Sequence, residues 1–196
     1  MRLYTEKKRI FIIMATSVVM NFSLFIIAYY FKLPLWLDTT GTIYAAVLLG
    51  SPAGFVVAIA NNLIQAFGFY GAESLLFYIV SALTAFVTGY MMKNRKRNIL
   101  RWLLLTVSLF AACSLASIIV TLITTEGIPA DYWGTMIYNT MIKKGSFPVL
   151  STVVSVSIVK FLDIVVSLLI VMLSIFLTPK SIKSNVATVK NDVVGN

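Results

Sequence analysis

The sequence contains no histidine and a single cysteine, Cys113. Without histidine the chain lacks the commonest general base and metal ligand at neutral pH, and one cysteine excludes an internal disulfide. Charged residues are also scarce, at 12% of the 196 residues, whereas soluble domains average about 25%. So few charges cannot cover a soluble surface, and they exclude a soluble enzyme, a disordered chain and a nucleic-acid-binding protein.

Apolar residues, by contrast, make up 59% of the chain and are grouped into long runs. A membrane-spanning helix needs about 20 mostly apolar residues. On this basis we predict an all-α membrane protein with six transmembrane helices, near residues 10–31, 38–50, 52–69, 75–92, 99–123 and 149–177. The sequence predicts one transmembrane domain over residues 1–180, followed by a polar cytoplasmic tail at 181–196.

The second predicted span is short and ends at Gly50-Ser51-Pro52. Glycine suits a helix end and proline a helix first turn, so this tripeptide predicts a turn between two helices. The alternative is one kinked helix over 38–69, which would be longer than a bilayer of about 30 Å requires.

Basic residues outnumber acidic ones by 16 to 7, and twelve of them lie in three clusters. The clusters are Arg2, Lys7, Lys8 and Arg9; Lys93, Arg95, Lys96, Arg97 and Arg101; and Lys180, Lys183 and Lys190. An even number of spans puts all three clusters on one side of the membrane, which the positive-inside rule identifies as cytoplasmic. Both termini are therefore expected in the cytoplasm. Binding of anionic lipid or of an acidic partner is the alternative role for these clusters.

The longest extracytoplasmic loop, residues 124–148, contains Tyr132, Trp133 and Asn139 among other polar and aromatic residues. Amphipathic aromatic side chains both pack and form hydrogen bonds, so this loop is a candidate lid over a ligand pocket. Aromatic residues also gather at membrane interfaces without any ligand. The sequence leaves both interpretations open.

Polar side chains inside a bilayer are costly, and they usually face a cavity or a partner. Six of those in the predicted spans stand out: Asp38, Asn61, Asn62, Gln65, Lys160 and Asp163. Each has a structural alternative, because Asp38 suits a helix N-cap, Lys160 and Asp163 are spaced for an ion pair, and amides can join helices. They come from three helices, in the external or middle part of each. We therefore predict that they converge on one outward-facing, substrate-binding pocket.

Two stretches of the chain carry a family resemblance. The first runs from Leu33-Pro-Leu-Trp-Leu-Asp38 through Gly50-Ser-Pro52-Ala-Gly54 to Asn61, and the second starts at Val159-Lys160-Phe-Leu-Asp163. Together they resemble the substrate-binding S components of energy-coupling factor (ECF) vitamin transporters. In that family an acidic residue opens the second helix, a Gly-Pro-x-x-Gly-type turn follows, and a charged residue of the last helix often holds the ligand. Here Ser51 interrupts the Gly-Pro step.

The resemblance implies a non-enzymatic subunit of a bacterial plasma membrane that captures a vitamin-like molecule from outside and needs no cofactor. A transmembrane scaffold (the T component) and two ATPase subunits would drive release. The family docks on its scaffold through an Ala-x-x-x-Ala pair of the first helix, which this chain lacks; it has such a pair at Ala112 and Ala116, where internal packing is the alternative. A membrane sensor or interaction module and a stand-alone secondary transporter are the other functions considered, although the latter usually shows inverted repeats.

Overall fold

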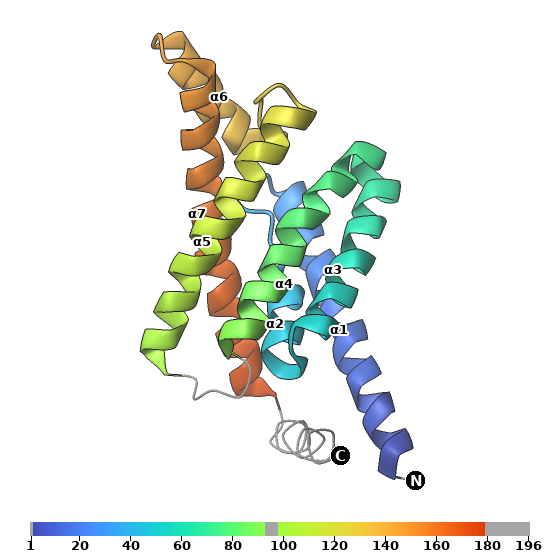
Figure 1. Ribbon diagram of the computed structural model, residues 1–196. Helices are drawn as coiled ribbons and strands as arrows, with labels where there is room; N and C mark the ends of the chain where they lie inside the picture. The colour runs from blue at the N-terminus through green and yellow to red at the C-terminus, as the bar shows by residue number, and fades with distance from the viewer. Residues whose placement is uncertain (1, 93–97, 179–196) are drawn as a thin grey trace.

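The computed structural model describes residues 2–92 and 98–178, with side chains from residue 7 onward. Within these ranges the chain forms helices joined by short segments and contains no β-strand, which confirms the all-α prediction. The elements are α1 (Arg2–Tyr30), α2 (Thr40–Leu49), α3 (Ser51–Gln65), the π-helical turn η1 (Ala66–Tyr70), the 3₁₀ helix η2 (Ala72–Phe77), α4 (Tyr78–Met92), α5 (Ile99–Thr124), α6 (Tyr132–Lys143) and α7 (Pro148–Leu177). Figure 1 shows them as one elongated bundle.

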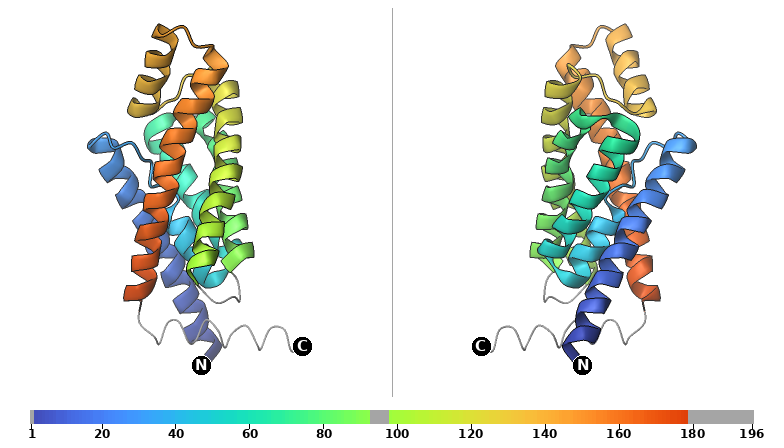
Figure 2. Two further views of the ribbon diagram at one scale, coloured as in Figure 1. Left: turned by 90° about the vertical axis from the view of Figure 1, so that its left-hand side faces the viewer. Right: turned by 90° about the vertical axis from the view of Figure 1, so that its right-hand side faces the viewer.

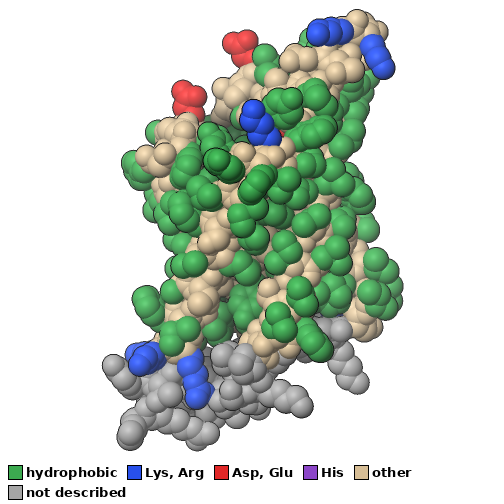
Figure 3. Space-filling view, turned by 180° about the vertical axis from the view of Figure 1, so that it is seen from behind, with side chains coloured by type: hydrophobic (Ala, Val, Ile, Leu, Met, Phe, Trp, Pro, Cys, Tyr) green, Lys and Arg blue, Asp and Glu red, His purple; other side chains and the backbone are tan. Residues whose placement is uncertain are grey.

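Five helical stretches of the described chain are long and apolar enough to cross a membrane: Lys7–Tyr30, Ser51–Tyr70, Ala72–Met92, Ile99–Thr124 and Pro148–Leu177. Figure 3 shows apolar side chains covering the middle of one face, with charged side chains near its two ends. This pattern is typical of a multi-pass membrane protein. The prediction of six spanning helices is met only in part, because α2 has ten residues and rises only about 15 Å.

The second crossing of the bundle is made by an extended segment followed by the short helix α2. From the upper end of α1, residues 31–39 turn back into the middle of the molecule, and α2 continues to the lower end (Figure 1). Pro34 removes a backbone donor and disfavours helix at the preceding residue, and Leu37 adopts a left-handed conformation with φ of 55°. These local features explain why residues 31–39 are not helical and why α2 begins only at Thr40.

The turn predicted between α2 and α3 is present. Gly50 has a φ of 95°, which glycine adopts without strain, and its N–H donates to the carbonyl of Ala46 at 3.0 Å. Pro52 lies in the first turn of α3. The alternative of one continuous helix over 38–69 is therefore wrong.

The beginning of α1 and the end of α7 lie at the same end of the bundle, and α6 lies at the opposite end (Figures 1 and 2). Residues 124–148, expected to be a loop, thus include a twelve-residue helix. The basic residues at 93–97 and 180–190, and the predicted tail at 181–196, lie outside the described residues.

A hydrophobic core between α2, α4, α5 and α7 holds these helices together. Ile43, Leu105, Leu109 and Val171 have almost no exposed surface and belong to one cluster. Cys113 is buried in the same cluster, and Ala116 packs against it. The position of Ala116 favours internal packing as the role of the Ala112/Ala116 pair.

Candidate functional site

A cavity of about 180 Å³ lies between the helices, and its lining includes residues 125–131, which lead directly into α6. Its walls come from residues 36–39, α3, η1, η2, α4, α5, residues 125–131 and α7. Four side chains predicted from the sequence line it: Asp38, Asn62, Gln65 and Lys160. The structure thus brings together polar groups that are more than 100 residues apart in the chain.

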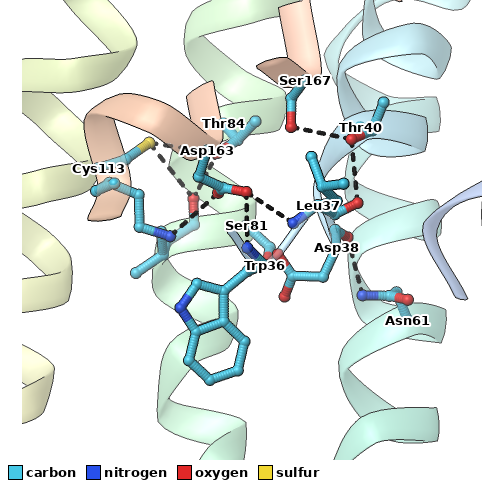
Figure 4. Close-up of polar contacts among 12 residues, drawn as sticks. Trp36, Leu37, Asp38, Thr40, Asn61, Ser81, Thr84, Cys113, Asp163 and Ser167 are labelled. Carbon is cyan, nitrogen blue, oxygen red and sulfur yellow. Dashed lines mark hydrogen bonds and ion pairs between the residues drawn. The ribbon is translucent and has the colours of Figure 1, made fainter. Parts of the chain in front are cut away.

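Asp38 sits in the cavity wall just before α2. Its carboxylate oxygen Oδ2 accepts a hydrogen bond from Gln65 Nε2 at 3.3 Å, and its backbone carbonyl accepts one from Asn61 Nδ2 at 3.0 Å. Figure 4 shows Asn61 directed at the backbone of this segment. Thr39, rather than Asp38, occupies the N-cap position of α2. The Asp38 carboxylate therefore does not cap α2, and it lines the cavity. Asn61 does not line the cavity and holds this segment through its hydrogen bond to the Asp38 carbonyl.

Asp163 and Lys160 form the ion pair that their spacing suggests, with 3.6 Å between Lys160 Nζ and Asp163 Oδ2. The other carboxylate oxygen of Asp163 accepts the backbone N–H groups of Trp36 at 3.0 Å and Leu37 at 2.7 Å (Figure 4). Asp163 is 1% exposed and does not line the cavity, whereas Lys160 does. Asp163 thus anchors residues 36–37 to α7, and Trp36 forms part of the cavity wall.

The polar residues predicted on the external side lie apart from the cavity. Trp133 Nε1 donates to the Lys32 carbonyl at 2.6 Å, and Lys32 Nζ lies 5.3 Å from the centre of the exposed Tyr132 ring. Asn139 is exposed on α6. Tyr132, Trp133 and Asn139 therefore tie α6 to the end of α1 or face outward, and none of them lines the cavity.

Asp131 is the charged residue of the segment before α6 that lines the cavity. Its side chain caps α6 by accepting the Gly134 N–H at 2.6 Å. Burial raises the pKa of the Asp131 carboxyl above its ordinary value, and the hydrogen bond from Gly134 opposes that shift. Asp131 was not among the predicted site residues, although Asp before a helix is an N-cap signal.

Other lining residues also went unpredicted. The rings of Trp36 and Tyr70 are 5.8 Å apart and form an aromatic part of the wall. Ser81 of α4, which accepts a hydrogen bond from Asn62 Nδ2 at 2.9 Å, and Ser117 and Thr121 of α5 add hydroxyl groups. Ser117 and Thr121 are spaced i, i+4, so their common helix face was visible in the sequence.

No protein family model matches this chain, and no curated protein or solved structure matches it significantly. Within the described residues, no group of three or more Cys, Asp or Glu side chains is placed to hold a metal ion. The cavity offers carboxylates, an ammonium group, amides, hydroxyls and aromatic rings. Such a set can bind a small polar molecule by hydrogen bonds and ring contacts.

Proposed function

We propose that this protein is the substrate-binding S component of an ECF-type importer, and that it captures a vitamin-like small molecule from the extracytoplasmic side. The observation that carries the proposal is the cavity itself. A charged and polar pocket inside a bundle with an apolar exterior is expensive to build, and it is of the kind that binds small ligands.

The position of individual residues supports the same proposal. The resemblance assigns ligand contact to a charged residue of the last helix, and Lys160, which matches that position, lines the cavity. Asp38, which matches the acidic residue that opens the second helix in the family, lines it too. The cavity volume of about 180 Å³ is below the range of about 300–1,000 Å³ usual for drug-sized ligands, which favours a small molecule.

In the proposed assembly, a T component and two ATPase subunits supply the energy, because the sequence has no glycine-rich phosphate-binding loop of its own. The cavity wall includes residues 125–131, which lead into α6, and α6 lies at the end of the bundle opposite the beginning of α1 and the end of α7 (Figures 1 and 2). With the termini in the cytoplasm, as the basic residues favour, this end faces outward and receives the ligand.

The proposal is tested by purifying the full chain in mild detergent and identifying small molecules released on denaturation by mass spectrometry. We expect a vitamin or a vitamin precursor in near-stoichiometric amount. Co-expression with a T component and two ATPases should yield a stable four-protein complex. Absence of both a bound small molecule and such a complex would overturn the proposal.

Two alanine variants, one of an amide side chain inside the cavity and one of an amide outside it, allow their ligand affinities to be compared. Gln65→Ala removes a cavity group that also donates to Asp38, and Asn139→Ala removes an exposed amide of α6. We expect Gln65→Ala to weaken binding of the co-purified molecule about tenfold and Asn139→Ala to leave it unchanged, as measured by isothermal titration calorimetry. Equal affinities for the two variants would place the ligand elsewhere.

A further inference from the structure

The cavity that we assign to the ligand has an excess of negative charge. Three carboxylate side chains, those of Asp38, Glu73 and Asp131, contribute to its described wall, against a single ammonium group, that of Lys160. That ammonium group is already paired with Asp163 at 3.6 Å. We propose that the ligand is a small organic cation carrying an amine or quaternary ammonium group, an inference that rests on the proposed function.

The carboxylate of Asp38 is the group best placed to receive this positive charge. It lines the cavity next to residues 36–37, and among the described residues the side chain that donates a hydrogen bond to it is that of Gln65, through Nε2 at 3.3 Å. A carboxylate oxygen has room for further donors, so Asp38 keeps acceptor capacity for a ligand N–H. Glu73 is exposed and Asp131 is partly buried, and both line the same cavity, where their negative charge attracts a cation.

Aromatic rings next to this carboxylate suit the same ligand. Trp36 is two residues before Asp38, and its ring lies 5.8 Å from that of Tyr70, with 58° between the ring planes. Both residues line the cavity. The face of an aromatic ring attracts a cation within about 6 Å of its centre, and tryptophan does so most strongly. A carboxylate together with two rings is a chemistry that favours a cation over a neutral molecule of equal shape.

A buried hydroxyl group in the cavity wall is available to a ligand. Ser117 is 3% exposed, lines the cavity, and its Oγ has no hydrogen-bond partner in the structure. Leaving a buried hydroxyl unpaired costs free energy. A ligand with a polar group besides its charged nitrogen would satisfy Ser117, so we expect the cation to carry a second, hydrogen-bonding group.

The proposal is tested on the purified wild-type chain with matched small molecules that differ in charge. One set is choline, its neutral isostere 3,3-dimethylbutan-1-ol, and 3,3-dimethylbutanoate. The other is benzylamine, benzyl alcohol and benzoate. We expect the cation of at least one set to bind about tenfold or more tightly than its neutral partner, and the anion to bind most weakly, by isothermal titration calorimetry. If no cation binds more tightly than its neutral partner, the proposal is wrong.

The Asp38→Asn variant removes the charge but keeps the shape and an oxygen for the Gln65 hydrogen bond. It should reduce the preference for the cation about tenfold, whereas Glu126→Gln should not change it, because Glu126 is exposed and lies outside the cavity wall. Thermal unfolding of both variants checks that they remain folded, and the wild-type series stands without them. An undiminished preference in folded Asp38→Asn would overturn the role of Asp38.

The mass spectrum of the co-purified molecule separates this inference from the proposed function. A cationic molecule supports both. A neutral or anionic molecule whose binding depends on Gln65 overturns the cation inference and leaves the proposed capture function standing. Absence of any bound molecule, together with absence of a complex with the scaffold and ATPases, overturns the proposed function itself.

Discussion

At the scale of single residues, Asp163 decides the shape of the site. Its carboxylate accepts two backbone N–H groups of the segment before α2 and pairs with Lys160. Non-helical backbone at membrane depth must find its hydrogen bonds within the protein. One side chain of α7 therefore satisfies the backbone of Trp36 and Leu37 and also fixes the ammonium group that lines the cavity.

Replacing Asp163 should consequently destabilise the protein rather than simply remove a ligand contact. Asp163→Ala leaves two N–H groups and the Lys160 charge without their partner, a loss of about 3–5 kcal/mol for a buried pair. Asp163→Asn keeps an acceptor oxygen for the N–H groups, so it should lie between Asp163→Ala and wild type. Thermal unfolding in detergent measures the order. Equal unfolding temperatures for Asp163→Ala and wild type would contradict this role.

The spacing of the charged residues predicted which of them belong together, but not which way each side chain points. The i, i+3 spacing of Lys160 and Asp163 indicated a pair on one face of a helix. It could not show that Lys160 lines the cavity while Asp163 binds backbone N–H groups 126 and 127 positions earlier in the chain. That distinction depends on the path of residues 31–39, which only the tertiary structure supplies.

At the scale of elements, α1 and α2 approach so closely that only glycine fits at position 41. A Cβ there would clash with the backbone carbonyl of Ser17, and the N–H of Gly41 donates to Asn21 Oδ1 at 2.5 Å. Asn21 Nδ2 in turn donates to Thr42 Oγ1 at 3.1 Å. The contact joins α2 to α1 through buried polar groups, so the position of the short helix depends on it.

Gly41→Ala should therefore separate α1 from α2. Gly68 is a helical glycine with open space around it, so Gly68→Ala should not disturb the fold. We expect Gly41→Ala to lower the free energy of unfolding by about 1–3 kcal/mol, as overpacking commonly does. Because α2 follows directly on the wall residues Asp38 and Thr39, ligand affinity should fall as well. Thermal unfolding and calorimetry of the two variants make the comparison, and the same stability for both would show that α1 moves aside freely.

The sequence predicts the long apolar helices but not the amphipathic helix α6. Long apolar runs indicated α1, α3, α4, α5 and α7, because hydropathy over about 20 residues is a strong signal. The helix α6 was missed, although Asp131 before it, Lys143 in its last turn and Gly145 after it are local helix signals. The mixture of polar and aromatic residues favours a loop, whereas the capping residues at the two ends favour the helix that the structure contains.

At the scale of the whole molecule, the path of the chain decides which parts lie at the same end of the bundle. The helices α1, α3 and α5 run toward the α6 end, and α4, α7 and the segment that ends in α2 run away from it (Figures 1 and 2). Five helical stretches of the described chain are long and apolar enough to span a membrane, so the even number of spans that the clustered basic residues favour stays a prediction. The beginning of α1 and the end of α7 lie at one end of the bundle, and α6 lies at the other.

Cysteine labelling tests this arrangement in living cells. Cys113 is 2% exposed, and Cys113→Ala gives a background without reactive thiols. Into it we would introduce Asn139→Cys, on the exposed face of α6, and Ile99→Cys, at the exposed start of α5 at the opposite end. A membrane-impermeant maleimide should label Asn139→Cys in intact cells and Ile99→Cys only after permeabilisation.

Each of the other labelling patterns would contradict either the orientation of the protein or the crossing of the membrane by α5. Labelling of Ile99→Cys alone in intact cells would invert the orientation, so that the cavity would lie nearer the cytoplasm and capture from outside would be wrong. Labelling of both positions from outside would mean that α5 does not carry the chain across the membrane. With Asn139→Cys alone labelled, the cavity lies toward the extracytoplasmic side, because its walls include residues 125–131, which lead directly into α6.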